Sequence, residues 1–127
     1  MELTANIQEG ADALIQARIE DEAGTALPSS EIESVTGFLY LPRVHGDRWI
    51  ERWDLDPADV WFDPVLLDAA WTQDEVGFNF RWQVEGSVFS RGGAAYKLEV
   101  RICTVSRGQI VYGGWLMTDS VLTDTRG

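Results

Sequence analysis

The fold is decided by the stretch Phe78-Asn79-Phe80-Arg81-Trp82-Gln83-Val84, in which large apolar residues stand at every second position. A period of two is typical of a β-strand with one buried face. The same alternation recurs in Tyr96-Lys97-Leu98-Glu99-Val100-Arg101-Ile102-Cys103. We therefore predict two strands here, with Trp82 on the core face of the first and Cys103 as a small packing residue opposite the apolar face of the second.

Five more segments outside this pair indicate strands. Residues 12–20 alternate between apolar and polar, and the run at 110–118 is apolar on both faces, which suits a central strand or a partner-facing surface. Gly113-Gly114 within that run indicates a bulge. The predicted strands are 12–20, 34–41, 49–53, 65–71 (a short strand or a turn), 78–85, 96–103 and 110–118.

The predicted connections are short. Asp21 to Gly24 reads as a turn in which Gly24 is free to adopt positive φ. At most one helical turn follows Pro28, and residues 43–47 read as a loop. Asp56 and Pro57 have the order of an N-cap and a first helical residue, which predicts a helix of about one turn.

About seven short strands with turn signals between them predict an all-β fold, an antiparallel sandwich or small barrel. Tyr96 follows a Gly-rich loop and begins a strand, as in the tyrosine corner of immunoglobulin-like sandwiches, where its hydroxyl returns to upstream backbone. We therefore predict an immunoglobulin-like or fibronectin III-like β-sandwich. The 127 residues suit a single domain, 1–127, with an N-terminal arm at 1–11 (an edge strand or a lead-in) and an extended tail at 119–127.

The charge balance excludes several functions. Twenty-one acidic residues oppose ten basic ones, for a net charge of −11. This disfavours nucleic acid and anionic membranes as partners, because both attract basic patches. One cysteine permits no internal disulfide, which fits a reducing cytosol. No signal peptide or membrane-spanning run is expected.

The candidate catalytic and metal sites are weak. The acidic run from Asp54 to Asp63 could hold calcium, but it departs from the EF-hand pattern, and caps and turns use aspartate heavily. His45 and Cys103 are too few donors for zinc. A Ser-His-Asp triad would have to use His45, and paired carboxylates are too common here to single out. We expect no enzyme, no metal and no cofactor.

Tryptophan is the more informative residue type. Four of the six tryptophans and nine of the 21 acidic residues lie between Asp47 and Glu75, where the strand pattern is weakest. Three uses stay open, namely an aromatic core, a protein interface and a platform for a ligand such as a sugar. The interface candidates are Trp49, Trp53, Trp61, Trp71, Val111, Trp115 and Met117.

Several segments carry a resemblance to a known group of proteins. They are residues 13–21, Gly24-Thr25-Ala26-Leu27, Glu31-Ile32-Glu33-Ser34-Val35, Trp71-Thr72-x-Asp74-x-x-Gly77-Phe78-Asn79-Phe80, and Tyr96-x-Leu98-Glu99-Val100. Together they cover roughly residues 12–118. The chain resembles small β-sandwich proteins from the head and tail structural modules of tailed bacteriophages.

This resemblance implies a non-enzymatic virion component, assembled in the host cytoplasm and repeated on a symmetric scaffold. Its partners would be other capsid or tail subunits, and it would form a homo-oligomer or a symmetric array. A capsid accessory (cement or decoration) or head–tail joining role is the leading expectation, and a tail or baseplate component is the nearest alternative. A carbohydrate-binding module using Trp49, Trp53, Trp61 or Trp71 is a second class, and a small hydrolase is a third.

Overall fold

The computed structural model describes residues 2–8, 10–71, 73–91 and 93–119. The strands among them are β1 (Glu2–Gln8), β2 (Ala13–Ala17), β3 (Ile32–Tyr40), β4 (Trp49–Leu55), β5 (Trp61–Leu66), β6 (Phe78–Val84), β7 (Ala95–Thr104) and β8 (Gly108–Asp119). The helices are α1 (Pro42–His45) and α2 (Pro57–Val60), with 3₁₀ turns at Ser29–Glu31 and Gly86–Val88. Beyond Asp119, the predicted tail lies outside the described residues.

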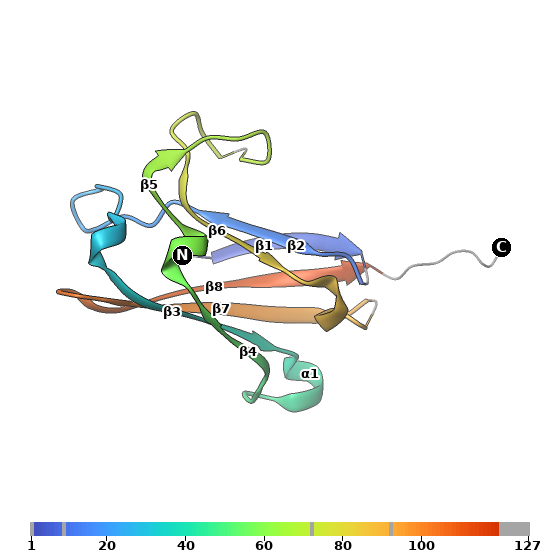
Figure 1. The fold of residues 1–127 in the computed structure, drawn as a ribbon. Coiled ribbons are helices and arrows are strands. Elements are labelled where there is room, and N and C mark those ends of the chain that lie inside the picture. The colour runs from blue at the N-terminus through green and yellow to red at the C-terminus, as the bar shows by residue number, and fades with distance from the viewer. Residues whose placement is uncertain (1, 9, 72, 92, 120–127) are drawn as a thin grey trace.

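The strands form two packed sheets, as predicted. The smaller has the order β2-β6-β5 and the larger has the order β1-β8-β7-β3-β4. Seven strands, β2 to β8, pair antiparallel, and β1 pairs parallel with β8 at the edge. In Figure 1 the smaller sheet lies above the larger, and α1 hangs below the larger sheet on its outer side.

The chain is an immunoglobulin-like sandwich, in which β7 corresponds to the strand that carries the tyrosine corner. The Tyr96 hydroxyl accepts a hydrogen bond from the backbone N–H of Arg91 at 3.2 Å, and the Tyr96 side chain is 1% exposed. The predicted return of this hydroxyl to upstream backbone is therefore confirmed. It ties the loop before β7 to the core.

The core between the sheets is built around Trp82, which is buried as predicted. Its ring lies against Gly37 of β3 and meets Trp53 edge-on at 5.1 Å between ring centroids. A Cβ atom at Gly37 would stand 2.9 Å from Cζ3 and 3.0 Å from Cζ2 of Trp82. The missing side chain at Gly37 therefore makes the slot that the indole fills.

The turns and caps were largely predictable. Gly24 has φ of 82°, and the Asp56 carboxylate accepts a hydrogen bond from Ala58 N at 3.0 Å at the start of α2. A single 3₁₀ turn follows Pro28. Residues 43–47, predicted as a loop, instead contain most of the one-turn helix α1, because Pro42 supplies a favourable first helical residue.

Two strand predictions were wrong in detail. The fifth strand is Trp61–Leu66 rather than 65–71, because the Trp61 ring packs on Phe80 across the pair, at 6.0 Å. No bulge occurs at Gly113-Gly114, since β7 and β8 pair without interruption along their length. Gly114 is instead buried opposite Leu98, where it borders a small apolar hollow between the sheets.

Asn79 alternates with the large apolar residues of its strand, a position that is typical of the polar face, yet it is 1% exposed. Its Oδ1 accepts a hydrogen bond from Ile19 N at 2.8 Å, and its Nδ2 donates to Ile19 O at 2.9 Å and Leu27 O at 3.3 Å. The segment that follows β2 folds over this position and buries it. The amide side chain takes the place of a strand partner for that segment.

Candidate functional site

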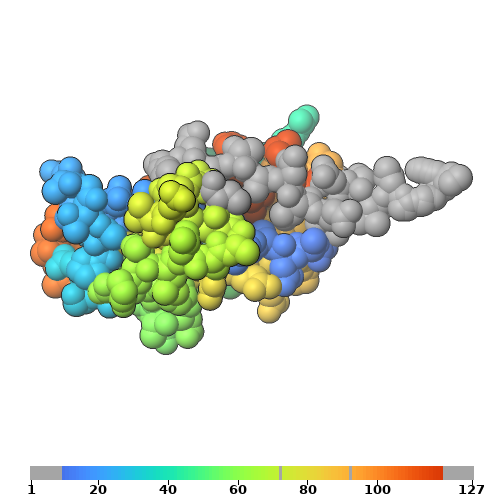
Figure 2. Space-filling view, turned by 90° about the horizontal axis from the view of Figure 1, so that it is seen from above, coloured from blue at the N-terminus to red at the C-terminus, as the bar shows by residue number. Residues whose placement is uncertain are grey.

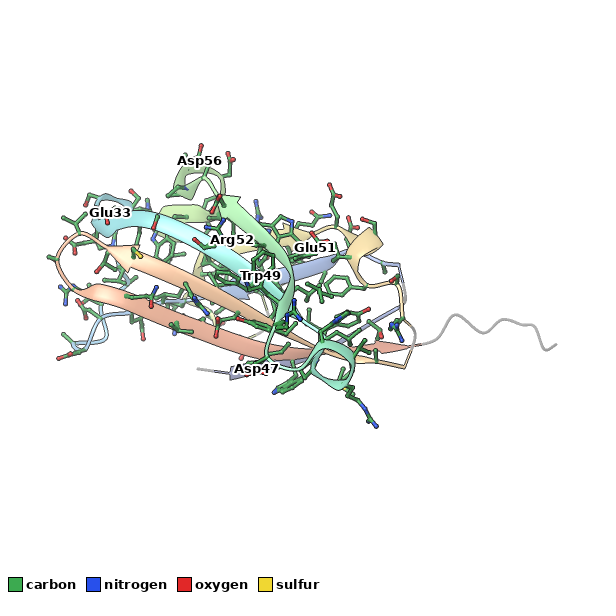
Figure 3. All side chains as sticks on the ribbon, turned by 90° about the horizontal axis from the view of Figure 1, so that it is seen from below. Glu33, Asp47, Trp49, Glu51, Arg52 and Asp56 are labelled. Carbon is green, nitrogen blue, oxygen red and sulfur yellow. The ribbon has the colours of Figure 1, made fainter. Side chains whose placement is uncertain are left out.

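The outer face of the larger sheet gathers most of the exposed aromatic residues. Register places Trp115 of β8 opposite Lys97 of β7, and it places Tyr40 of β3 between Lys97 and Trp49 of β4. One row of side chains thus crosses four strands. We define the outer face as the outward residues Val111, Gly113, Trp115, Met117, Lys97, Glu99, Arg101, Thr36, Phe38, Tyr40, Trp49, Arg52 and Asp54. Figure 3 looks onto this face, with Trp49 and Arg52 labelled on β4.

The apolar side chains of this face are open to solvent. Trp49 is 50% exposed and Trp115 is 38% exposed, while Val111 and Met117 are 47% and 40% exposed. Aromatic residues, methionine and arginine are enriched in protein interfaces. This composition indicates a contact surface.

Phe38 lies beneath the exposed residues of the face. It is 6% exposed, because the Arg101 guanidinium stacks on its ring at 4.3 Å and Trp49 tilts against it at 6.1 Å. A cation on an aromatic ring is held by the ring's quadrupole. Phe38 is therefore an anchor that orders the charged and aromatic groups around it.

Most charges on the face are already paired. Tyr40 Oη donates to Glu99 Oε1 at 3.2 Å, and Arg101 Nε donates to the same oxygen at 2.9 Å. Burial, followed by the charge of Glu99, raises the pKa of Tyr40, and the hydrogen bond with Glu99 raises the pKa of Arg101. Arg52 and Asp54 form a further ion pair at 3.1 Å. The paired charges lower the cost of covering this face.

A hollow of about 410 Å³ opens where α1 overhangs the face. Tyr40, Lys97 and Trp115 line its sheet side, and Asp47 closes it from the α1 side. Figure 3 shows Asp47 beside α1. The hollow combines aromatic rings with a cation and carboxylates, so it can accept a polar group that also stacks.

Of the seven interface candidates from the sequence, four lie on the outer face: Trp49, Val111, Trp115 and Met117. Trp53 is half-buried and turned toward Trp82. Trp61 was a wrong candidate, because it is 4% exposed and its Nε1 donates to Leu27 O at 3.0 Å inside the core. It is equally excluded as an exposed sugar platform.

Sequence reasoning missed four members of the face: Phe38, Tyr40, Lys97 and Arg101. Their alternation with buried neighbours was visible in both strands. What the sequence could not show is the register that sets Tyr40 beside Lys97 and Phe38 beside Glu99. The sequence therefore indicated which residues of each strand point outward, but not which of them are neighbours across the sheet.

Trp71 lies on the other side of the molecule, in the loop between β5 and β6. Its ring tilts against Phe78 at 5.9 Å, and its Nε1 donates to Asp74 Oδ1 at 3.0 Å. Arg18 Nη2 lies 2.6 Å from Asp74 Oδ2, and Gly77 N donates to Asp74 at 3.2 Å. In Figure 2, which looks down on the side of the smaller sheet, this yellow-green segment lies at the surface. The half-buried Trp71 thus serves to fix this loop.

These contacts predict a dependence of stability on pH. The Arg18 hydrogen bond, ahead of that from Trp71, holds the pKa of Asp74 far below its ordinary value. The stabilisation is complete above the unfolded-state pKa of about 3.9 and is lost as the pH falls toward the folded-state pKa. We expect the difference in melting temperature between the wild type and Asp74→Asn to shrink from pH 6 to pH 2. Thermal denaturation followed by circular dichroism measures it, and a constant difference would contradict this role.

Aspartates of the acidic run from Asp54 to Asp63 make structural contacts. Asp56 caps α2, Asp54 pairs with Arg52, and Asp63 Oδ2 accepts from Ser29 N at 3.3 Å. Among the described residues, no group of three or more His, Cys, Asp or Glu side chains is placed to hold a metal ion. In the same part of the chain, no helix is long and apolar enough to cross a membrane.

His45 and Cys103 lie apart in the fold. His45 is exposed on α1, and Cys103 is half-buried on the outward side of β7. Comparisons of the chain with protein-family models, with curated proteins and with solved structures find no match.

Proposed function

We propose that this chain is a non-enzymatic structural protein that acts through protein–protein contacts on its outer face. The observation that carries the proposal is the row Trp115, Lys97, Tyr40 and Trp49, which crosses four strands and remains open to solvent. Interfaces concentrate their binding energy in a few aromatic and arginine side chains. This row and the stacked Arg101 supply those residue types on one surface.

The setting that we propose is a bacteriophage virion, with the chain as a capsid accessory or a head–tail joining component. It rests on the resemblance of residues 12–118 to phage β-sandwich proteins, and a tail or baseplate position is the alternative within it. In a repeated array, each copy needs only a modest interface, because symmetry multiplies the contacts. A sheet face that requires no rearrangement to bind suits such a role.

Mass spectrometry of purified virus particles tests whether the chain is a virion component. We expect the chain to co-purify with the particles in a fixed ratio to their other subunits. Its absence from purified particles would overturn the virion role. The contact role of the outer face would then be assessed separately, by the variants below.

Trp115→Ala is expected to weaken assembly far more than folding. The side chain lies on the outward side of β8, so its loss should change the free energy of unfolding by less than about 1 kcal/mol. Removing an aromatic anchor from an interface costs about 2 kcal/mol or more of binding. Co-sedimentation with particles and chemical denaturation measure the two effects.

The matched control is Val105→Ala, which removes an exposed apolar side chain from the turn between β7 and β8. It should alter neither quantity. If Trp115→Ala instead unfolds the isolated domain, β8 contributes its outward side to the core and the contact assignment is wrong.

Carbohydrate binding is a second candidate, favoured by the hollow beside α1. Trp115 and Tyr40 offer ring faces there, and Asp47 and Glu99 offer acceptors for hydroxyl groups. Tryptophan fluorescence titrated with a panel of oligosaccharides tests it. A saturable change that Trp115→Ala abolishes would favour this function over assembly.

A further inference from the structure

We propose that a second copy of this chain covers the outer face, related by a two-fold axis that passes between Lys97 and Glu99 of β7. This dimer rests on the proposed function, because that proposal assigns the outer face as a contact surface. The dimer identifies one partner of the outer face, a second copy of the chain, and fixes how the two copies are arranged.

Charge favours a second copy approaching from this side. The outer face carries three basic residues, Lys97, Arg101 and Arg52, beside the acidic Glu99 and Asp54. The chain as a whole has a net charge of −11, so all of its excess negative charge lies elsewhere. Two copies that approach through other sides repel each other, whereas two outer faces meet almost without net charge.

The register makes the charges of this face self-complementary. Lys97 and Glu99 point outward from β7, about 7 Å apart along the strand. A two-fold axis that runs between the two faces, perpendicular to β7 and level with the midpoint of Lys97 and Glu99, places each Lys97 opposite the Glu99 of the second copy. The pair therefore gains two ion pairs from one strand.

The same axis matches the shapes of the neighbouring strands. Trp115 lies beside Lys97 on β8, and Phe38 lies beside Glu99 on β3. The rotation reverses each strand over its own equivalent, so each Trp115 falls on Gly113 of the other copy, where no side chain obstructs the ring. It also brings each Tyr40 over the Arg101 guanidinium that is stacked on Phe38 of the other copy. The large side chains thus meet a stacked guanidinium or an open space.

The area of the face suffices for such a pair. Strands β8, β7, β3 and β4 lie about 4.8 Å apart, and a strand of ten residues extends about 33 Å. With its side chains the face spans on the order of 600 Å², close to the roughly 800 Å² per partner of a standard interface. The overhanging α1 bounds the face at one end, and the axis carries the second copy's α1 to the opposite end.

A charge exchange tests the axis. Sedimentation equilibrium of the wild type should give a mass approaching twice the 14.2 kDa monomer as concentration rises. Lys97→Glu and Glu99→Lys each place like charges opposite one another, and each should weaken the dimer on the order of a hundred-fold. An equimolar mixture of the two variants should dimerise again, because the heterodimer restores both opposite pairs.

A second test uses Gly113, which takes no part in the hydrogen bonds among Tyr40, Glu99 and Arg101. A Cβ at Gly113 would meet only Leu98 O, at 3.8 Å, and it points to the outer side of β8, so we expect Gly113→Leu to fold as the wild type does. Its side chain fills the space for the second copy's Trp115 and should abolish the dimer. Gln109→Leu is the matched control, because it adds the same side chain to the same side of β8 near the turn, far from the axis.

Every outcome bears on the inference. A wild type that stays monomeric at all concentrations overturns it, whether or not the chain is found on particles. A dimer that survives Gly113→Leu, or variants that do not recover on mixing, overturns the proposed axis. A dimer with these responses but absent from particles supports the inference and refutes the virion setting alone.

Discussion

Asn79→Leu is expected to lower the free energy of unfolding by about 2–4 kcal/mol. The change removes three buried hydrogen bonds and leaves the N–H of Ile19 without its acceptor. The carbonyl groups of Ile19 and Leu27 keep other donors, Leu27 N and the Trp61 indole. The N–H of Ile19 accounts for most of the lost stability, because a buried donor without an acceptor loses its hydration and gains no hydrogen bond in return.

Chemical denaturation monitored by circular dichroism measures this loss. The matched control is Gln83→Leu, which removes an amide from an exposed position of the same strand, where it bonds Asp12 at 2.8 Å. The control should change stability by no more than about 0.5 kcal/mol. If the two variants are equally stable, Asn79 does not hold the segment after β2.

Gly37→Ala is expected to destabilise the fold by about 1–3 kcal/mol, which is the usual cost of overpacking a core. The added methyl group would collide with the Trp82 ring, which is 6% exposed and also packed on Trp53. The indole cannot move away from the added methyl group without disturbing its contact with Trp53. A lower denaturation midpoint and an altered near-ultraviolet tryptophan signal are the expected readouts.

Gly113→Ala is the matched control for this substitution. Gly113 lies in a strand of the same sheet, and its Cβ would find only an ordinary contact with Leu98 O. Because alanine restricts the unfolded chain more than glycine does, this control should be neutral or slightly stabilising. Equal losses in both variants would show that strand propensity, and not the Trp82 slot, requires Gly37.

Much of the fold could be predicted because alternation reports local burial. The strands around Trp82 and Tyr96, the turn at Gly24 and the cap at Asp56 all depend on neighbours within a few residues. The fifth strand could not be placed, since its bounds depend on Trp61 packing against Phe80, a distant residue. Tertiary contacts decide such segments.

The candidate site was predictable only in part, for the same reason. Residue type singled out Trp49 and Trp115, yet type alone could not separate them from Trp61, which has the same side chain and lies in the core. Asn79 shows the converse, because a polar residue at an outward position is buried by the segment after β2. In each case the missing information is which segment covers the side chain.

Alternate residues of strand β8 have two separate roles. Ile110, Tyr112, Gly114 and Leu116 face the other sheet, while Val111, Gly113, Trp115 and Met117 face away from it. Substitutions in the second set can alter recognition while the first set preserves the fold. Across related chains, the inward set should therefore vary slowly, and the outward set should change together with the surface that it contacts.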